Sequence, residues 1–269
     1  MPPNQKVRVC AVEYLNTVPL VWGMLHGDQR GLFDLSFSVP SQCADRLAEG
    51  SAEIGIVPSI QLTRQNLKII RGAGIACRGP VRSILLISKV PFAEIRTLAA
   101  DSSSRTSVVL SRIILSRKYG AEPLLISEAP DLVRMLDHAD ACLIIGDPAL
   151  LLDPADIPFH VLDLGAEWTD LTGLPMVFAV WAARDDVAAQ SPEPFLRSLQ
   201  FGLDHLDDIV QSEHVNRQIT ADLAHQYLTR NIVFQLGDAE YRGLDRFLQY
   251  ASDLEIHAGT HAAHQVTVL

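Results

Sequence analysis

Hydroxyl-bearing residues and an arginine gather in one short segment, DSSSRTS at residues 101–107, immediately before an apolar run of helical spacing. The segment therefore lies at a helix N-terminus, where unpaired backbone N–H groups and a partial positive charge bind carboxylates. It holds more donors than one helix cap requires. The donors that we expect to face an anionic ligand are the four serines of this segment (Ser102, Ser103, Ser104 and Ser107) together with Arg105 and Thr106. The alternative is a well-capped helix with Arg105 in water.

Two further polar segments stand at turns. Asn16 lies in EYLNT at residues 13–17, and its amide can donate and accept at once, which suits the orientation of a polar ligand. Equally, Asn16 could cap the helix that follows. Ser83 comes after the turn RGPVR at residues 78–82 and enters a strand, so its hydroxyl would face a ligand cleft. The alternative there is a simple turn with a solvated arginine.

The fourth segment, IGDPAL at residues 145–150, ends a buried apolar strand. Gly146 lets a ligand approach the backbone, because it carries no side chain. Asp147 either holds a ligand hydroxyl or caps a short helix. None of the four segments offers a histidine or lysine as a conventional general base.

Metal and cofactor chemistry finds little support in the sequence. There is no Walker loop, no GxSxG and no GxGxxG motif. His257, His261 and His264 fall in a Gly-containing segment, which we interpret as a solvated tail rather than a metal site. The four cysteines form no CxxC pair and indicate buried, reduced thiols. We therefore expect no metal and no cofactor.

The elements that must position these segments alternate between strands and helices. The first predicted strands are residues 6–12, 35–39, 54–57 and 83–88. Residues 18–26 have helical spacing, and Ser41 is the predicted N-cap of a helix that Gly50 ends. Further strands are predicted at residues 97–100, 124–127, 141–145 and 175–183, with helices at 106–119 and 130–138. Three amphipathic helices follow, near residues 194–210, 215–229 and 239–253.

This rhythm predicts an α/β protein in which a second α/β unit interrupts the first. Strands that alternate with helices indicate parallel sheets with crossovers. Two chain crossings, near residues 85–95 and 175–182, would form a paired hinge. The arrangement is that of a type-2 periplasmic-binding-protein-like fold, with two α/β lobes and a ligand cleft between them. We predict that residues 1–90 and 180–269 form the first lobe and residues 91–179 the second.

Composition narrows the class of partner. The 269 residues carry a net charge of −10, which repels phosphate backbones and anionic lipid, so we expect neither nucleic acid nor membrane as partner. A small anionic substrate is possible where local donors override that field. The N-terminal residues show no secretory signal, and no apolar run approaches the roughly 20 residues of a membrane span. We expect a cytoplasmic location.

Six strings, in order along residues 7–183, resemble those of a known enzyme family. They are YLNTVPL (14–20), LAEG with IGIVPS (47–59), GPVRSILLISK (79–89), DSSSRTSVVL (101–110), LIIGDPAL (143–150) and DLTGLPMVFAVWA (170–182). The family they resemble is the chorismate dehydratases of the futalosine route to menaquinone.

The resemblance implies a reaction and a set of site residues. Chorismate loses water, its ring becomes aromatic, and 3-[(1-carboxyvinyl)oxy]benzoate results without a cofactor. By the same resemblance, the helix N-terminus at residues 104–107 holds one carboxylate, supported by Ser83 and Arg105. Asn16 fixes the enolpyruvyl arm or the departing hydroxyl, while Gly146 and Asp147 close the far side.

The resemblance also implies substrate-assisted catalysis, in which the enolpyruvyl carboxylate of chorismate removes the ring proton. The enzyme then contributes proximity and orientation in a dry cleft. Asn16 and Asp147 are the residues expected to take part in catalysis, with Asp147, or failing that Glu13, as the alternative base.

Three alternative functions compete with this one. A transport binding protein has this fold but needs a signal sequence, and a regulatory effector domain needs a DNA-binding module for which no residues remain. The nearest rival is the 1,4-dihydroxy-6-naphthoate synthase of the same pathway. The strings GPVRS, SSSRTS and TGLPMVFAVW favour the dehydratase.

Overall fold

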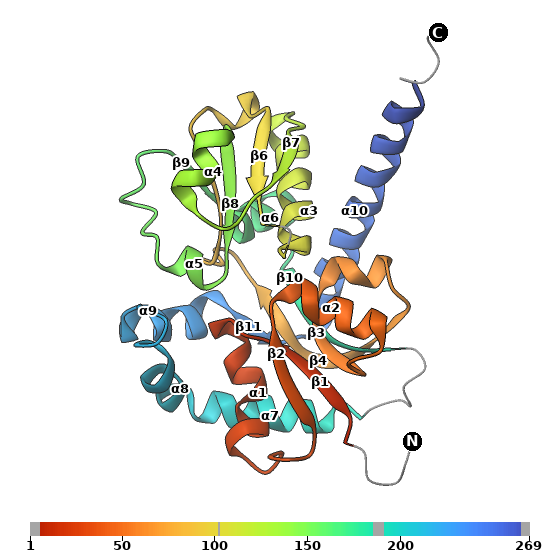
Figure 1. Cartoon of the computed structure of the whole chain (residues 1–269), viewed down its shortest axis with the longest axis vertical. Coiled ribbons are helices and arrows are strands. Elements are labelled where there is room, and N and C mark those ends of the chain that lie inside the picture. The colour runs from red at the N-terminus through yellow and green to blue at the C-terminus, as the bar shows by residue number, and fades with distance from the viewer. Residues whose placement is uncertain (1–5, 102, 185–190, 265–269) are drawn as a thin grey trace.

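The chain folds around two sheets, each with helices packed against it (Figure 1). The computed structural model describes residues 6–101, 103–184 and 191–264, and the side chains of these residues as far as Leu254. Ser102, in the predicted donor segment, lies outside the described residues. We call the six-stranded sheet with its helices the first lobe, and the five-stranded sheet with its helices the second lobe.

The chain builds most of the first lobe, then all of the second, and then returns. The first part contains β1 (Arg8–Val12), α1 (Val18–His26), β2 (Asp34–Ser38), α2 (Pro40–Glu49), β3 (Ile54–Pro58) and β4 (Leu67–Cys77). The second lobe contains β5 (Ile84–Ser88), β6 (Thr97–Ala100), α3 (Arg105–Ile114), β7 (Leu124–Ser127), α4 (Leu132–His138), β8 (Ala141–Ile145), α5 (Asp147–Leu150), β9 (His160–Asp163) and α6 (Leu164–Thr172). The returning part contains β10 (Met176–Arg184), α7 (Glu193–Asp204), α8 (Leu206–Glu213), α9 (Ala221–Gln226), β11 (Val233–Gln235) and α10 (Asp238–His264).

Strand pairing confirms the predicted α/β class and corrects the direction of two strands. The sheet orders are β11-β4-β10-β3-β1-β2 and β7-β6-β8-β5-β9. The predicted parallel pairing is correct among β1, β2 and β3 and among β6, β7 and β8. It is wrong for β5 and β10, which run antiparallel to their neighbours. The chain passes between the lobes at residues 78–83, earlier than the predicted 85–95, and again at residues 173–175. β5 and β10 come directly after these two passages, so they enter their sheets from the opposite end.

The same two strands bear on the predicted lobe ranges. β5 falls within residues 1–90, yet it pairs with β8 and β9 of the second lobe. β10 begins at Met176, four residues before the predicted return at 180, and pairs with β3 and β4. The division into a first lobe of residues 1–90 and 180–269 and a second lobe of residues 91–179 stays a prediction.

The longest strand, β4, was not predicted, and its glycines explain why. Gly72 and Gly74 interrupt its apolar pattern, and glycine in a strand is a weak signal. Gly72 has φ +100, and a Cβ there would meet the Leu196 side chain at 2.9 Å. A Cβ on Gly74 would meet the carbonyl oxygen of Ala179, in β10, at 2.7 Å. Close approach of neighbouring chains therefore selects glycine where the sequence suggests a turn.

Helix boundaries also differ from the predictions. α2 begins at Pro40 with Val39 as its N-cap, and Ser41 makes no capping bond, because proline is well suited to the first helical position. Gly50 ends the helix at φ 77, as predicted. The segment of His257, His261 and His264 is helical, because α10 continues to His264; their side chains lie outside the described residues.

Candidate functional site

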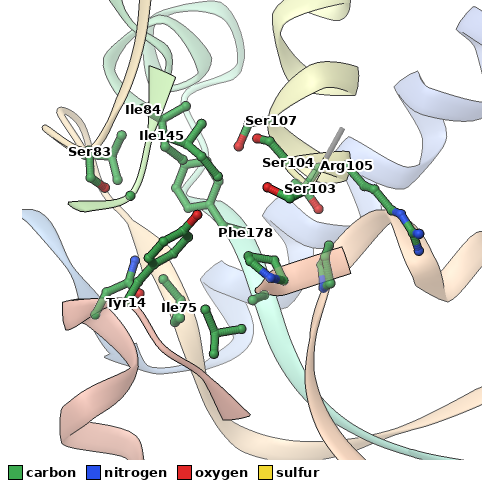
Figure 2. A pocket seen from close by; sticks show the side chains of 18 residues that line it. Tyr14, Ile75, Ser83, Ile84, Ser103, Ser104, Arg105, Ser107, Ile145 and Phe178 are labelled. Carbon is green, nitrogen blue, oxygen red and sulfur yellow. The ribbon is translucent and has the colours of Figure 1, made fainter. Parts of the chain in front are cut away.

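A cavity of about 530 Å³, partly open to solvent, lies between the two lobes. Three strands from the two sheets end at it: Val12, Pro58 and Ile145 are the last residues of β1, β3 and β8, and all three line the cavity. Ligands of open α/β sheets bind beyond the carboxyl ends of strands, so this is the expected place. Its middle is apolar, with Phe178 and Ile84 from opposite lobes (Figure 2).

The N-terminus of α3 supplies the polar wall of the second lobe. Ser103, Ser104, Thr106 and Ser107 all line the cavity, and each is at least nine-tenths buried. The first backbone hydrogen bond of α3 runs from Val108 N–H to Ser104 O. The N–H groups of residues 105–107 therefore have no acceptor within the helix. Ser104 is the N-cap residue but makes no capping bond, and its buried Oγ has no hydrogen-bond partner among the described residues.

Arg105 differs from its predicted role as a carboxylate donor. Its Nη2 lies 2.8 and 2.9 Å from the two carboxylate oxygens of Asp45, in α2 of the first lobe. Figure 2 shows the guanidinium directed away from Tyr14 and Phe178 in the middle of the cavity. Thr106 also reaches the first lobe, because its Oγ1 accepts from the N–H of Ile60 at 3.3 Å. Both residues therefore link the lobes.

Asn16 and Ser83 meet through a residue that the sequence analysis missed. Asn16 Nδ2 donates to the Tyr227 hydroxyl at 3.0 Å, and that hydroxyl donates to Ser83 Oγ at 2.8 Å. The other amide atom, Asn16 Oδ1, is buried and has no partner among the described residues. Asn16 is not the cap of α1, which has Thr17 as its N-cap and no side-chain capping bond. Tyr227 carries no local signal, because an aromatic residue in an amphipathic helix predicts only packing.

Asp147 is held by the first lobe rather than free in the cavity. Its Oδ1 accepts from the N–H of Leu15 at 3.0 Å, and its Oδ2 is paired with Arg217. Burial raises the pKa of Asp147 despite the opposing effect of Arg217. Asp147 is not among the cavity-lining residues, nor does it cap α5, whose N-cap is Gly146. The alternative base Glu13 is exposed and does not line the cavity either.

Gly146 makes room for Tyr14. It has φ +65, which favours glycine, and a Cβ there would lie 2.8 Å from the Tyr14 ring. The ring therefore occupies the approach that was predicted for a ligand, although both residues line the cavity. Tyr14 points its hydroxyl into the cavity (Figure 2). Burial, together with the charges of Asp101 and Asp147, raises the pKa of Tyr14 to about 12, so its phenol stays protonated at neutral pH.

Metal-binding clusters and membrane-spanning helices are both absent from the described part of the chain. Across residues 6–101, 103–184 and 191–254, whose side chains are described, no group of three histidine, cysteine, aspartate or glutamate side chains is placed to hold a metal ion. No helix in those ranges is both long and apolar enough to span a bilayer.

Comparison with known proteins identifies relatives along nearly the whole chain. A family model described as menaquinone biosynthesis matches residues 7–253. A chorismate dehydratase of Thermus thermophilus is 27% identical over 238 residues, which cover 81% of this chain and 86% of that protein. A chorismate dehydratase of Campylobacter jejuni is 24% identical over 255 residues, 91% of this chain and 97% of that protein.

Solved structures share the fold. Protein AF1704 of Archaeoglobus fulgidus aligns with a TM-score of 0.74 at 17% identity, over 94% of this chain and 99% of its own. The periplasmic aliphatic sulphonate binding protein SsuA of Escherichia coli aligns with a TM-score of 0.62 at 15% identity, over 95% and 88%. The predicted periplasmic-binding-protein-like fold is thereby confirmed.

Proposed function

Because this chain belongs to the menaquinone biosynthesis family, we propose that it is a chorismate dehydratase, which converts chorismate to 3-[(1-carboxyvinyl)oxy]benzoate and water. Two relatives of that name, each aligned over at least four-fifths of both chains, support the activity. The observation that carries the proposal is the interlobe cavity, where the donors of the α3 N-terminus stand across an apolar middle from Asn16 and Ser83.

The cavity suits a small dianion with a ring. Chorismate has two carboxylates on an apolar ring system, and anions bind where backbone N–H groups and hydroxyls converge at a helix N-terminus. The α3 donors, Ser104 and Ser107 among them, are candidates for one carboxylate. The surfaces of Phe178 and Ile84 are candidates for the ring. This local site accounts for anion binding by a protein whose net charge is −10.

The elimination needs a base, and the lining supports one carried by the substrate. Among the described residues that line the cavity there is no histidine, lysine, aspartate or glutamate. Tyr14 is a neutral phenol, and Asp147 is bound to Leu15 and Arg217 outside the lining. The enolpyruvyl carboxylate takes the ring proton, and the bond between the ring and its hydroxyl group breaks. The carboxylic acid so formed returns the proton to the departing hydroxyl, which leaves as water. The protein holds the reacting groups in position.

Pathway and location are part of the proposal. We assign the reaction to the futalosine route in the cytoplasm, which the resemblance of the six strings supports. The substrate is the small anion chorismate, and neither nucleic acid nor a membrane is expected as partner.

A chromatographic assay tests the activity. The protein is incubated with chorismate, with and without a chelator, and the mixture is separated to detect the aromatic enolpyruvyl benzoate. We expect product in both mixtures. Activity that disappears with the chelator and returns with zinc contradicts the cofactor-free reaction. Tight binding of chorismate without turnover favours a solute-binding protein, and turnover of a later pathway compound instead of chorismate favours the 1,4-dihydroxy-6-naphthoate synthase.

A further inference from the structure

We propose that Tyr227 is a positioning residue that gives Asn16 and Ser83 opposite hydrogen-bonding polarity toward the substrate. The inference rests on the proposed function and deepens it, because it assigns the chemical group that each residue meets. With Asn16 donating to the phenol and the phenol donating to Ser83, the Asn16 amide oxygen is left as an acceptor and Ser83 keeps its O–H as a donor.

Three distant segments meet at this point. Asn16 comes from the turn after β1, Ser83 immediately precedes β5, and Tyr227 begins a π-helical turn, Tyr227–Asn231, that continues α9. Asn16 and Ser83 line the cavity, whereas Tyr227 does not and stands behind them with 1% of its surface exposed. Tyr227 therefore acts on a ligand only through its two neighbours.

The phenol has one proton, and this couples its neighbours. It donates that proton to Ser83 Oγ and receives a hydrogen bond from Asn16 Nδ2. The amide therefore turns its oxygen, Oδ1, away from Tyr227, and this buried oxygen has no partner among the described residues. Ser83 accepts from the phenol and so keeps its own O–H for the cavity.

If the phenol proton pointed to Asn16 instead, the hydrogen-bonding roles of Asn16 and Ser83 would both be reversed. If the phenol donated to Asn16, the amide would present its NH2 to the cavity, and Ser83 would donate to the phenol and present only lone pairs. When the phenol donates its proton to one of these two neighbours and accepts from the other, it leaves one of them as a donor and the other as an acceptor. Burial raises the pKa of Tyr227, which keeps that proton in place at neutral pH.

This polarity selects between the two roles expected for Asn16. A carboxylate has no proton to donate and is repelled by an amide oxygen, whereas a hydroxyl donates to it. The ring hydroxyl of chorismate therefore meets Asn16 Oδ1, and a carboxylate oxygen accepts from Ser83. The contact with Asn16 orients the C–O bond that breaks, so it affects turnover more than it affects the binding of the two carboxylates.

Tyr227→Phe tests the proposal, with Tyr241→Phe as the matched control. Tyr241 is also a buried tyrosine, and its hydroxyl accepts from the N–H of Gly72 at 2.8 Å, outside the cavity lining. We expect Tyr227→Phe to lower kcat by about 10- to 100-fold while KM changes by less than about 3-fold. The affinity for the reaction product, which keeps both carboxylates but lacks the ring hydroxyl, should stay unchanged. Tyr241→Phe should leave kcat unchanged.

Two further measurements separate positioning from mere structural support. Because Tyr227 acts partly through Ser83, the loss of kcat in the double variant should be smaller than the product of the losses in Tyr227→Phe and Ser83→Ala. The side-chain amide signal of Asn16 in nitrogen-15 spectra, assigned by its absence in Asn16→Asp, should shift in Tyr227→Phe. Unchanged kcat, equal losses of kcat and product affinity, or an unshifted amide signal each overturn the proposal. The amide signal needs no turnover, so a parent protein that fails to dehydrate chorismate removes the proposed function and still leaves the network tested.

Discussion

Arg105 and Asp45 join the two lobes through an ion pair in which one guanidinium nitrogen lies 2.8 and 2.9 Å from the two carboxylate oxygens. A second link, from Leu15 N–H to Asp147, also spans the lobes. The cavity is therefore seen in a closed arrangement, held by bonds between side chains and backbone groups that belong to different sheets.

Closure should be reversible and favoured by ligand. Hinged two-lobed proteins open and close around their ligands, and the links at Arg105 and Asp147 can re-form each time. We expect small-angle scattering to give a smaller radius of gyration with product bound than without it. Identical profiles at saturating product would mean that the cavity is closed before the ligand arrives.

Arg105→Gln and Asp45→Asn should have matching, small effects. The pair is partly exposed, and such a pair contributes about 0–1 kcal/mol, so each variant should raise KM by less than about 5-fold. The measurement is KM for chorismate in both variants. A far larger rise of KM in Arg105→Gln than in Asp45→Asn would mean that Arg105 binds a substrate carboxylate, as the sequence predicts.

The α3 hydroxyls should contribute to substrate affinity. A charge-assisted hydrogen bond is worth ~1.5–3 kcal/mol, so Ser104→Ala and Ser107→Ala should each weaken product binding by about 10- to 150-fold. Calorimetry with the product measures this. Ser111→Ala is the control, because Ser111 is buried in the same helix and donates to Val108 O instead. Parent-like affinity in both test variants would place the carboxylate elsewhere.

Asn16→Asp should be nearly inactive. A carboxylate cannot donate to Tyr227, and its charge repels the substrate's own carboxylates. Asp147→Asn and Glu13→Gln should keep measurable rates with a shallow pH dependence, since neither side chain lines the cavity. Steady-state rates between about pH 6 and 9 check both statements. If Asp147→Asn abolished turnover with affinity and fold intact, Asp147 would be the base.

Glu53 should make stability depend on pH in the acid range. The Arg8 side chain and the Arg8 N–H, the latter at 2.8 Å, hold the pKa of Glu53 below its usual value of 4.5. A lowered folded pKa gives stability that is present above the unfolded pKa and lost as pH falls through the folded pKa. Glu53→Gln should therefore cost about 1–3 kcal/mol at pH 7 and progressively less below pH 4.5. Denaturant unfolding at several pH values measures the difference, and a cost that stays constant with pH contradicts the assignment.

Local pattern predicted the elements better than it predicted the partners of site residues. β6, β7 and β8 lie where their apolar runs indicate, and Asn16, Ser83 and the α3 N-terminus converge on one cavity because strand ends meet there. The partner of Asn16 is 211 positions away, and the acid that binds Arg105 is 60 positions away. Such contacts depend on how whole lobes pack, so no spacing in the sequence encodes them.

The π-helical turn Tyr227–Asn231 sets limits on recombination between relatives. Its first residue, Tyr227, is hydrogen-bonded to Ser83, and its last, Asn231, donates from Nδ2 to Pro80 O at 2.9 Å. Both ends of the turn therefore bind the segment through which the chain enters the second lobe. A chimera that exchanged only β6 to α6 would inherit this junction intact. One that exchanged the C-terminal helices would keep the junction only where the donor protein supplies side chains that make the same two bonds. Deletion of one residue within the turn would break it, because an ordinary α-helical turn rotates the two ends apart.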